Sequence, residues 1–146
     1  MILDTKSYDE FCGLVYQVSG ITLGKGKEAL VSSRIGKRMR HLGMVEFKAY
    51  LKMVKQDPEG KEIVHLLDAI STNVTSFFRE SQHFDLIKGL FAGWLEEGQR
   101  KFRFWSAACS TGEEPYTLAM TLAEVLDGRD VDLKILATDI STRVLE

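Results

Sequence analysis

The sequence predicts an all-helical domain followed by the first β-α-β unit of a doubly wound α/β domain, which is incomplete in these 146 residues. Apolar residues recur at helical spacing up to about residue 70. A polar, β-branched segment then interrupts the pattern, and two short apolar runs of strand length follow, with one helical segment between them. We therefore expect a helical domain at residues 1–71, an ordered linker at 72–80, and the start of the α/β domain at 81–146.

Four amphipathic helices account for the first domain. The first is expected over about residues 7–19, opened by a capping box that starts at Ser7 and stopped by Gly20. The second covers about residues 26–42. The third contains residues 47–54 and ends before Pro58. The fourth carries apolar residues at i, i+3, i+4 and i+7, namely Ile63, Leu66, Leu67 and Ile70. Short links between such helices predict a small bundle.

The α/β part begins with a fifth helix over about residues 81–97. Strands are expected at 102–108 and 133–138, and the helix between them covers about 115–126, with Pro115 at its first position. A helical crossover of this length joins parallel strands, which are usually buried on both faces. Two strands alone also leave unpaired edges, so we expect this unit either to self-associate or to be poorly ordered.

The composition is that of a globular protein, with 45% hydrophobic and 27% charged residues. No apolar run approaches the roughly 20 residues of a membrane span, and the charged N-terminus does not resemble a signal peptide. A cytoplasmic protein without membrane insertion is therefore expected. Cys12 and Cys109 lie far apart and predict free thiols, with neither a disulfide framework nor a metal site.

The second predicted helix is strongly basic, although the net charge of the chain is only −2. Between Lys25 and His41 there are six Lys and Arg residues and one acid. Arg34, Lys37 and Arg38 cluster on the side opposite the apolar stripe. This face is either simply solvated or a docking surface for an acidic partner helix. DNA binding is a weaker alternative because the total charge is not basic, and we expect no nucleic-acid partner.

Ligands of open α/β sheets bind at the carboxyl ends of the strands, which here are the loops at 108–114 and 139–142. Asp139 ends the second strand, where an acid commonly binds ribose hydroxyls. The first loop lacks GxGxxG and carries Glu113 and Glu114, which disfavour a phosphate and suit a cationic nucleoside such as S-adenosylmethionine. Alternatively, the two glutamates complement the helix dipole and Asp139 caps the next helix.

Three blocks of the sequence match a known family in order and spacing. They are TNVTSFFRE at 72–80, FWSAACSTGEEPY at 104–116 and ATDI at 137–140. The chain closely resembles the N-terminal portion of the CheR-type chemotaxis receptor methyltransferases over its whole length. The resemblance implies a Rossmann-like domain that binds S-adenosylmethionine and releases S-adenosylhomocysteine.

The resemblance also implies roles for individual residues. Asn73, Thr75 and Arg79 would reach the cofactor from the linker, Glu114 would lie near its methionyl end, and Asp139 would bind its ribose. Arg79 is also the candidate catalytic residue, because its planar donor fork suits the orientation of a substrate carboxylate. Apart from the resemblance, Asn73 and Thr75 could simply satisfy the backbone of a turn, and Arg79 could pair with Glu80 or with a helix end.

The implied activity is methyl transfer to glutamate side chains of methyl-accepting chemotaxis receptors, whose acidic methylation helices suit the basic second helix. A glutamate is already an anionic nucleophile at pH 7, so no general base is required. The competing hypothesis is a non-catalytic module that recognises an acidic helix of a receptor or another partner.

Overall fold

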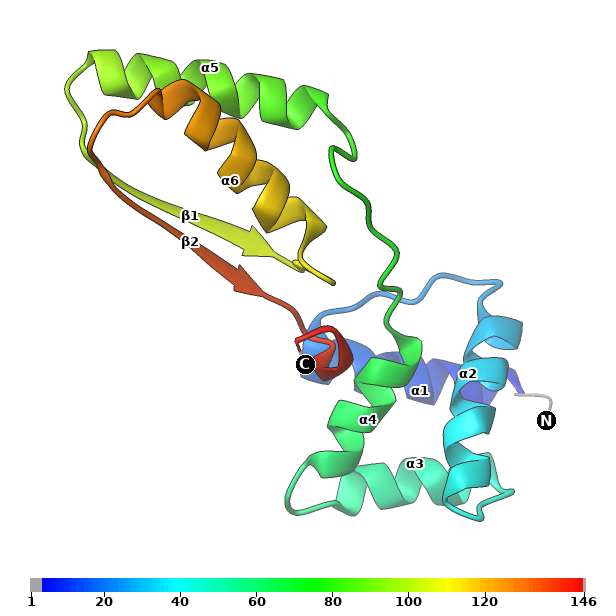
Figure 1. Ribbon diagram of the computed structural model, residues 1–146. Helices are drawn as coiled ribbons and strands as arrows, with labels where there is room; N and C mark the ends of the chain where they lie inside the picture. The colour runs from blue at the N-terminus through cyan, green and yellow to red at the C-terminus, as the bar shows by residue number, and fades with distance from the viewer. Residues whose placement is uncertain (1–3, 146) are drawn as a thin grey trace. The chain divides into compact units, whose positions relative to one another are not determined.

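The computed structural model describes residues 4–145, which divide into two compact units (Figure 1). One unit contains the chain up to Thr72 together with Ile140–Thr142. The other contains Asn73–Asp139 and the residues from Arg143 onward. None of the helices within residues 4–145 combines the length and the hydropathy that a membrane span needs.

The first unit is the predicted bundle of helices: α1 (Thr5–Ser19), α2 (Glu28–His41), α3 (Phe47–Gln56) and α4 (Lys61–Ile70). The predicted apolar stripes form one core, in which Phe11 of α1 lies 5.8 Å from Phe47 of α3 between ring centroids. Val31 and Ile35 of α2 and Leu66 of α4 are buried in the same core.

The start of α1 differs from the prediction. Asp4 is the N-cap, and its carboxylate accepts hydrogen bonds from the Ser7 N–H and the Ser7 hydroxyl, both at 2.9 Å. The proposed capping box at Ser7 is therefore wrong, because the aspartate three residues earlier satisfies the free N–H groups of the first turn. The predicted stop is confirmed, since Gly20 takes the left-handed conformation at φ 73° and its N–H bonds to the Tyr16 carbonyl.

The second unit contains α5 (Gln82–Glu96), β1 (Lys101–Ala107), α6 (Glu113–Leu126) and β2 (Asp132–Thr138). The two strands pair in parallel, from Lys101 beside Asp132 to Ala107 beside Thr138. The predicted β-α-β unit and its parallel strands are thereby confirmed. A short 3-10 turn, η1 (Thr142–Val144), follows β2.

Both helices of this unit lie on the same face of the sheet (Figure 1). Phe91 and Leu95 of α5, Phe102 of β1 and Leu122 of α6 form its buried core. Side chains on the opposite face are open, and 68% of Trp105 and 59% of Leu136 are exposed. Alternate strand residues point away from α5 and α6, so these two helices leave this second face of the sheet open. The expected burial of both faces therefore stays a prediction.

Candidate functional site

The loop after β1 has an unusual backbone. Ala108 and Ser110 adopt positive φ values of 71° and 48°, and Gly112 adopts 101°. Non-glycine residues rarely occupy this region, which costs conformational energy that the surroundings must supply. The loop is held by hydrogen bonds from the N–H groups of Ala108 and Cys109 to the Thr138 carbonyl, at 2.9 and 2.8 Å. The carboxyl ends of β1 and β2 therefore stay together beyond the last strand residues.

Ser110 brings two of the predicted cofactor residues together. Its N–H donates to Oδ2 of Asp139 at 2.8 Å, and its hydroxyl donates to the Asn73 carbonyl at 2.8 Å. Ser110 is buried, so both bonds are shielded from water. The linker, the loop after β1 and the end of β2 consequently meet at one residue.

The carboxylate of Asp139 is thus oriented before any ligand binds. A carboxylate offers about four acceptor positions, so the bond from Ser110 is compatible with further bonds from ribose hydroxyls. The location of Asp139 at the carboxyl end of a parallel strand is the usual one for such an acid. The position and the donor-acceptor chemistry of Asp139 therefore fit the nucleoside of S-adenosylmethionine.

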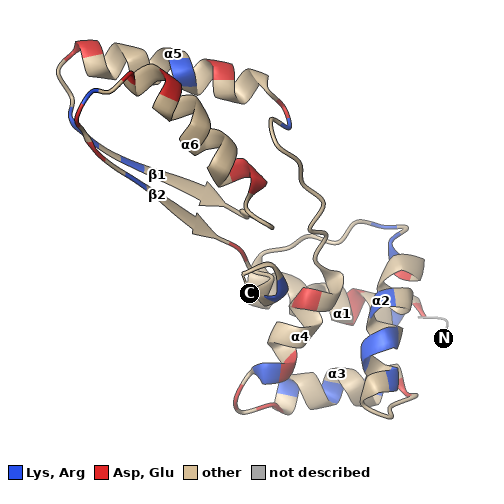
Figure 2. Cartoon of the chain, in the orientation of Figure 1, with Lys and Arg blue, Asp and Glu red and all other residues tan. Residues whose placement is uncertain are grey.

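Glu113 and Glu114 lie in the first turn of α6, where Figure 2 shows the acidic start of the helix. Glu114 accepts a hydrogen bond from the Ser106 hydroxyl at 2.6 Å, and Glu113 accepts one from the Thr111 hydroxyl at 2.6 Å. Both carboxylates complement the positive end of the helix dipole, as the alternative interpretation required. Glu114 is nevertheless exposed beside the end of β1, where it can also accept from an amino group.

The start of α6 corrects a detail of the sequence analysis. The helix begins at Glu113 with Gly112 as its N-cap, so Pro115 is the third helical residue and not the first. The first four helical N–H groups have no partner within the helix, so a proline is tolerated at this position as well.

The linker residues Thr75 and Arg79 have less structural support as cofactor residues than Asn73 and Asp139. Arg79 is exposed and donates to the Val74 carbonyl at 3.0 Å, a contact within the linker that the sequence did not predict. Thr75 is half-buried. The linker is fastened to α6 by the Phe78 N–H, which donates to the Thr117 hydroxyl at 3.2 Å. The roles of Thr75 and Arg79 toward a cofactor stay predictions.

The buried thiol of Cys109 lies in the same loop. Burial raises its pKa, and the nearby negative charge of Asp139 raises it further. The thiol therefore stays protonated at neutral pH, which argues against a nucleophilic role.

Two residues that matter here were not singled out from the sequence: Ser106 and Ser110. Ser106 is a polar residue at an inward position of β1, and this break in an apolar run is a usable signal. Ser110 had no comparable signal, because its two bonds depend on the positive φ of its own backbone.

The basic face predicted on the second helix lies on α2, which carries several Lys and Arg residues (Figure 2). Arg34 turns toward the end of α4, where its guanidinium donates to the Ile70 carbonyl at 2.5 Å and to the Ser71 carbonyl and the Thr72 hydroxyl at 3.1 Å each. Arg34 therefore satisfies carbonyl groups that the helix end leaves without partners.

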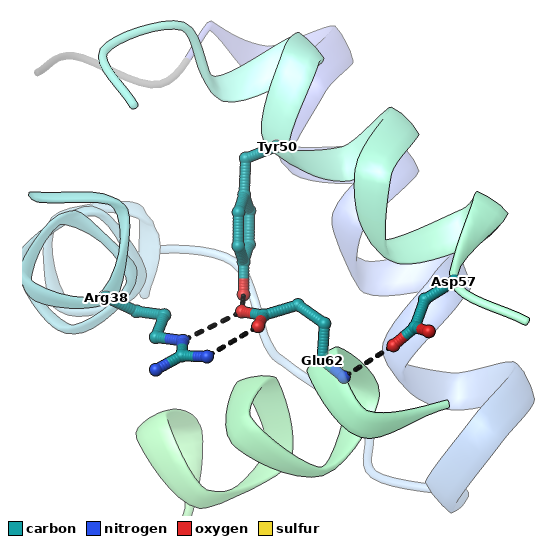
Figure 3. A network of polar contacts seen from close by, with 4 residues as sticks. All are labelled: Arg38, Tyr50, Asp57 and Glu62. Atoms are coloured by element: carbon teal, nitrogen blue, oxygen red, sulfur yellow. Dashed lines mark hydrogen bonds and ion pairs between the residues drawn. The ribbon is translucent and has the colours of Figure 1, made fainter. Parts of the chain in front are cut away.

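Arg38 is engaged within the bundle as well. Its Nε and Nη2 donate to the two oxygens of Glu62 at 2.9 and 2.6 Å, and the Tyr50 hydroxyl donates to Glu62 at 2.9 Å (Figure 3). Asp57 accepts from the Glu62 N–H at 2.7 Å and so holds the start of α4. Of the three predicted partner-binding residues, Lys37 is exposed and makes no ion pair within residues 4–145.

The charges of this network are set by opposing effects. Burial raises the pKa of Glu62, but the hydrogen bonds from Arg38 and Tyr50 and the positive charge of Arg38 together lower it more, so the pKa lies below its ordinary value. Burial and then the negative charge of Glu62 raise the pKa of Tyr50. At neutral pH the network is thus a carboxylate, a guanidinium and a neutral phenol. An open hollow of about 710 Å³ beside it is lined by residues of the helical unit, among them Leu42, Met53 and His65.

Comparison with known proteins gives matches along the chain. Residues 6–71 match the CheR methyltransferase all-alpha domain, and residues 73–146 match the CheR methyltransferase SAM binding domain. The chain is 38% identical over its whole length to a chemotaxis protein methyltransferase of Salmonella typhimurium, of which it covers 49%. It is 41% identical over 91% of its length to that of Escherichia coli, of which it covers 45%, and 40% identical over 90% to that of Borreliella burgdorferi, of which it covers 49%.

The chain spans about half the length of these curated relatives. Its two matched regions occur in the order expected from the sequence, a helical domain before the start of a cofactor domain. The family resemblance and the fold class expected from the sequence are both confirmed. The chain belongs to the CheR methyltransferase family.

Proposed function

We propose that the full-length protein transfers a methyl group from S-adenosylmethionine to glutamate side chains of chemotaxis receptors, giving methyl esters. The observation that carries the cofactor part is the meeting of Asn73 and Asp139 at Ser110, at the carboxyl ends of the parallel strands. The match of residues 73–146 to a SAM binding domain supports it. The names of the relatives, chemotaxis protein methyltransferases, support the substrate class.

The chain's own residues would bind and orient the reactants. Asp139 would accept hydrogen bonds from ribose hydroxyls, and Glu114 would attract the cationic methionyl end of the cofactor. The cofactor supplies the electrophilic methyl group. The substrate glutamate is an anion at neutral pH, so the protein's contribution is alignment and exclusion of water.

Arg79 is proposed to orient the substrate carboxylate through its guanidinium. Its bond to the Val74 carbonyl uses one of five N–H donors, so donors remain for an incoming anion. Asn73 and Thr75 would position the linker against the cofactor. A cytoplasmic location belongs to the same proposal, because the cofactor is made and used inside the cell.

A direct test measures transfer of tritiated methyl groups from S-adenosylmethionine to the cytoplasmic domain of a receptor by the full-length protein. We expect label that is released by mild base, since a carboxyl methyl ester hydrolyses under conditions that leave N-methyl groups intact. Arg79→Lys should lower the rate more than the affinity for cofactor. Receptor binding without any labelling would instead favour the alternative of a non-catalytic binding module.

The basic face of α2 is proposed to recognise the acidic methylation helix of the receptor. Because Arg34 and Arg38 hold the bundle together, the test belongs on Lys37 and Arg40, which are exposed. Lys37→Glu combined with Arg40→Glu should lower receptor methylation and leave cofactor affinity unchanged, and wild-type binding should weaken as salt rises. Normal methylation by this double variant would show that these two side chains form only a solvated surface.

Self-association of the 146-residue chain is proposed from its open sheet. Trp105 and Leu136 present apolar surface on the face opposite α5 and α6, and within residues 4–145 the sheet has two strands. Exposed apolar surface and unpaired strand edges both favour contact with a second copy.

A further inference from the structure

A buried hydroxyl of α6 holds the linker next to Arg79. Thr117 is completely buried, and its hydroxyl accepts a hydrogen bond from the Phe78 N–H at 3.2 Å. The same hydroxyl donates to the Glu113 carbonyl at 2.6 Å, so its proton is used there and its lone pairs face the linker amide. These residues all belong to the second unit, which contains Asn73–Asp139. The contact is therefore internal to one compact unit.

The backbone that Thr117 holds is strained. Phe78 and Glu80 both adopt a positive φ of 54°, a conformation that residues other than glycine keep where their surroundings hold them in it. The ring of Phe78 supplies a second contact, because it meets the ring of Phe84 in α5 edge-on, with 6.3 Å between centroids. Phe78 is thus bound to α6 through its backbone and to α5 through its ring.

Arg79 lies between the two strained residues. Its Cα is about 3.8 Å from that of Phe78, so a change in the Phe78 backbone alters the direction in which the guanidinium leaves the chain. Arg79 also donates to the Ser76 carbonyl through its N–H at 3.4 Å and to the Val74 carbonyl through its guanidinium at 3.0 Å. Both of these partners lie in the same exposed segment and can move with it. The bond to Thr117 instead fixes the segment to a helix.

The beginning of the linker is held by a different contact. The Asn73 carbonyl accepts from the Ser110 hydroxyl at 2.8 Å, a bond in which Thr117 takes no part. Loss of the Thr117 hydroxyl should therefore disturb Arg79 and leave Asn73 in place.

We propose that Thr117 is a positioning residue for the reaction, which sets the direction of the Arg79 side chain by binding the backbone of Phe78. Because Thr117 is completely buried, it acts through the linker and not by touching the substrate. This inference rests on the proposed function, since it assumes that Arg79 orients the substrate carboxylate.

The test compares Thr117→Val with Thr121→Val in the full-length protein. Valine resembles threonine in shape and lacks the hydroxyl, so Thr117→Val removes the acceptor of the Phe78 N–H. Thr121 is the matched control, because it is a second buried threonine of α6, and its hydroxyl donates to the Thr117 carbonyl at 2.9 Å within the same helix.

Thr117→Val should lower the rate of methyl transfer to the receptor's cytoplasmic domain by about tenfold, a loss that one hydrogen bond can account for. Affinity for S-adenosylhomocysteine, measured by isothermal titration calorimetry, should change by less than about twofold, because Asn73 and Asp139 keep their bonds to Ser110. Thr117→Ser should restore most of the rate, since serine keeps the hydroxyl. Thr121→Val should leave both quantities close to wild type. In hydrogen exchange, the Phe78 amide should exchange faster in Thr117→Val and not in Thr121→Val.

Three outcomes would overturn the inference. Wild-type transfer by a folded Thr117→Val variant shows that the bond does not orient Arg79, and it leaves the proposed function intact. An equal loss of rate in Thr121→Val, or a loss of cofactor affinity as large as the loss of rate, shows that the Thr117 hydroxyl acts through general stability. If the wild-type protein transfers no methyl groups, the proposed function fails and the inference fails with it. Should Thr117→Val not fold, Thr117→Ala serves in its place, because it removes the same acceptor, and the same outcomes decide.

Discussion

Removal of the Arg38 side chain tests the interpretation of the basic helix most sharply. Arg38 forms a two-pronged pair with Glu62, and the two side chains are only 20% and 10% exposed. In Arg38→Ala, Glu62 keeps its bond from the Tyr50 hydroxyl but loses both charged donors. A substitution that leaves a buried charge without its partner costs about 3–5 kcal/mol, and partial exposure reduces this to about 2–3 kcal/mol here.

Urea unfolding followed by far-UV circular dichroism measures this loss, and Lys37→Ala is the matched control. Lys37 is on the same helix and exposed, so its removal should change the free energy of unfolding by less than about 0.5 kcal/mol. If Arg38→Ala is no less stable than Lys37→Ala, the Arg38–Glu62 pair does not stabilise the bundle, and Arg38 is available to a partner after all.

The remaining predictions concern the pH dependence, the first helix and the open sheet. The lowered pKa of Glu62 means that its stabilisation is present above the ordinary glutamate pKa of about 4.3 and is lost as the pH falls through the lower pKa of the folded protein. The stability difference between wild type and Glu62→Gln should therefore shrink in acid, as urea titrations at several pH values would show. Asp4→Ala should cost about 1 kcal/mol in the same assay by removing the N-cap of α1, and an unchanged stability would contradict the cap. Light scattering on the 146-residue chain should detect dimers or larger species, and Trp105→Lys should lower the fraction of chains in them. A monomer whose strand amides are strongly protected in hydrogen exchange would refute the self-association.

The helices and strands were predictable because their signals are local. The spacing of apolar residues predicted α1 to α6 and both strands to within a few residues. The helical segment between the two strands predicted that they pair in parallel. The errors occurred at helix ends, where Asp4 replaced Ser7 as a cap and α6 began before Pro115. At these positions several nearby residues can satisfy the same free N–H groups, and the sequence does not rank them.

The contacts of long polar side chains were not predictable from the sequence. A helical wheel placed Arg34 and Arg38 on the polar side of α2, but their flexible side chains reach back to α4, to residues at least 24 positions away. Of the cofactor residues, the acid after β2 was identifiable from strand position alone, whereas Ser110 depends on a backbone conformation that emerges only in the fold.

The central claim is that Asp139 belongs to a site for S-adenosylmethionine, and calorimetric titration of that cofactor into wild-type and Asp139→Ala full-length protein tests it most directly. Loss of a charged hydrogen bond predicts weaker binding by roughly 1–3 kcal/mol in the variant, with the fold retained by circular dichroism. Equal affinities of the two folded proteins, or no binding by either, would contradict the account.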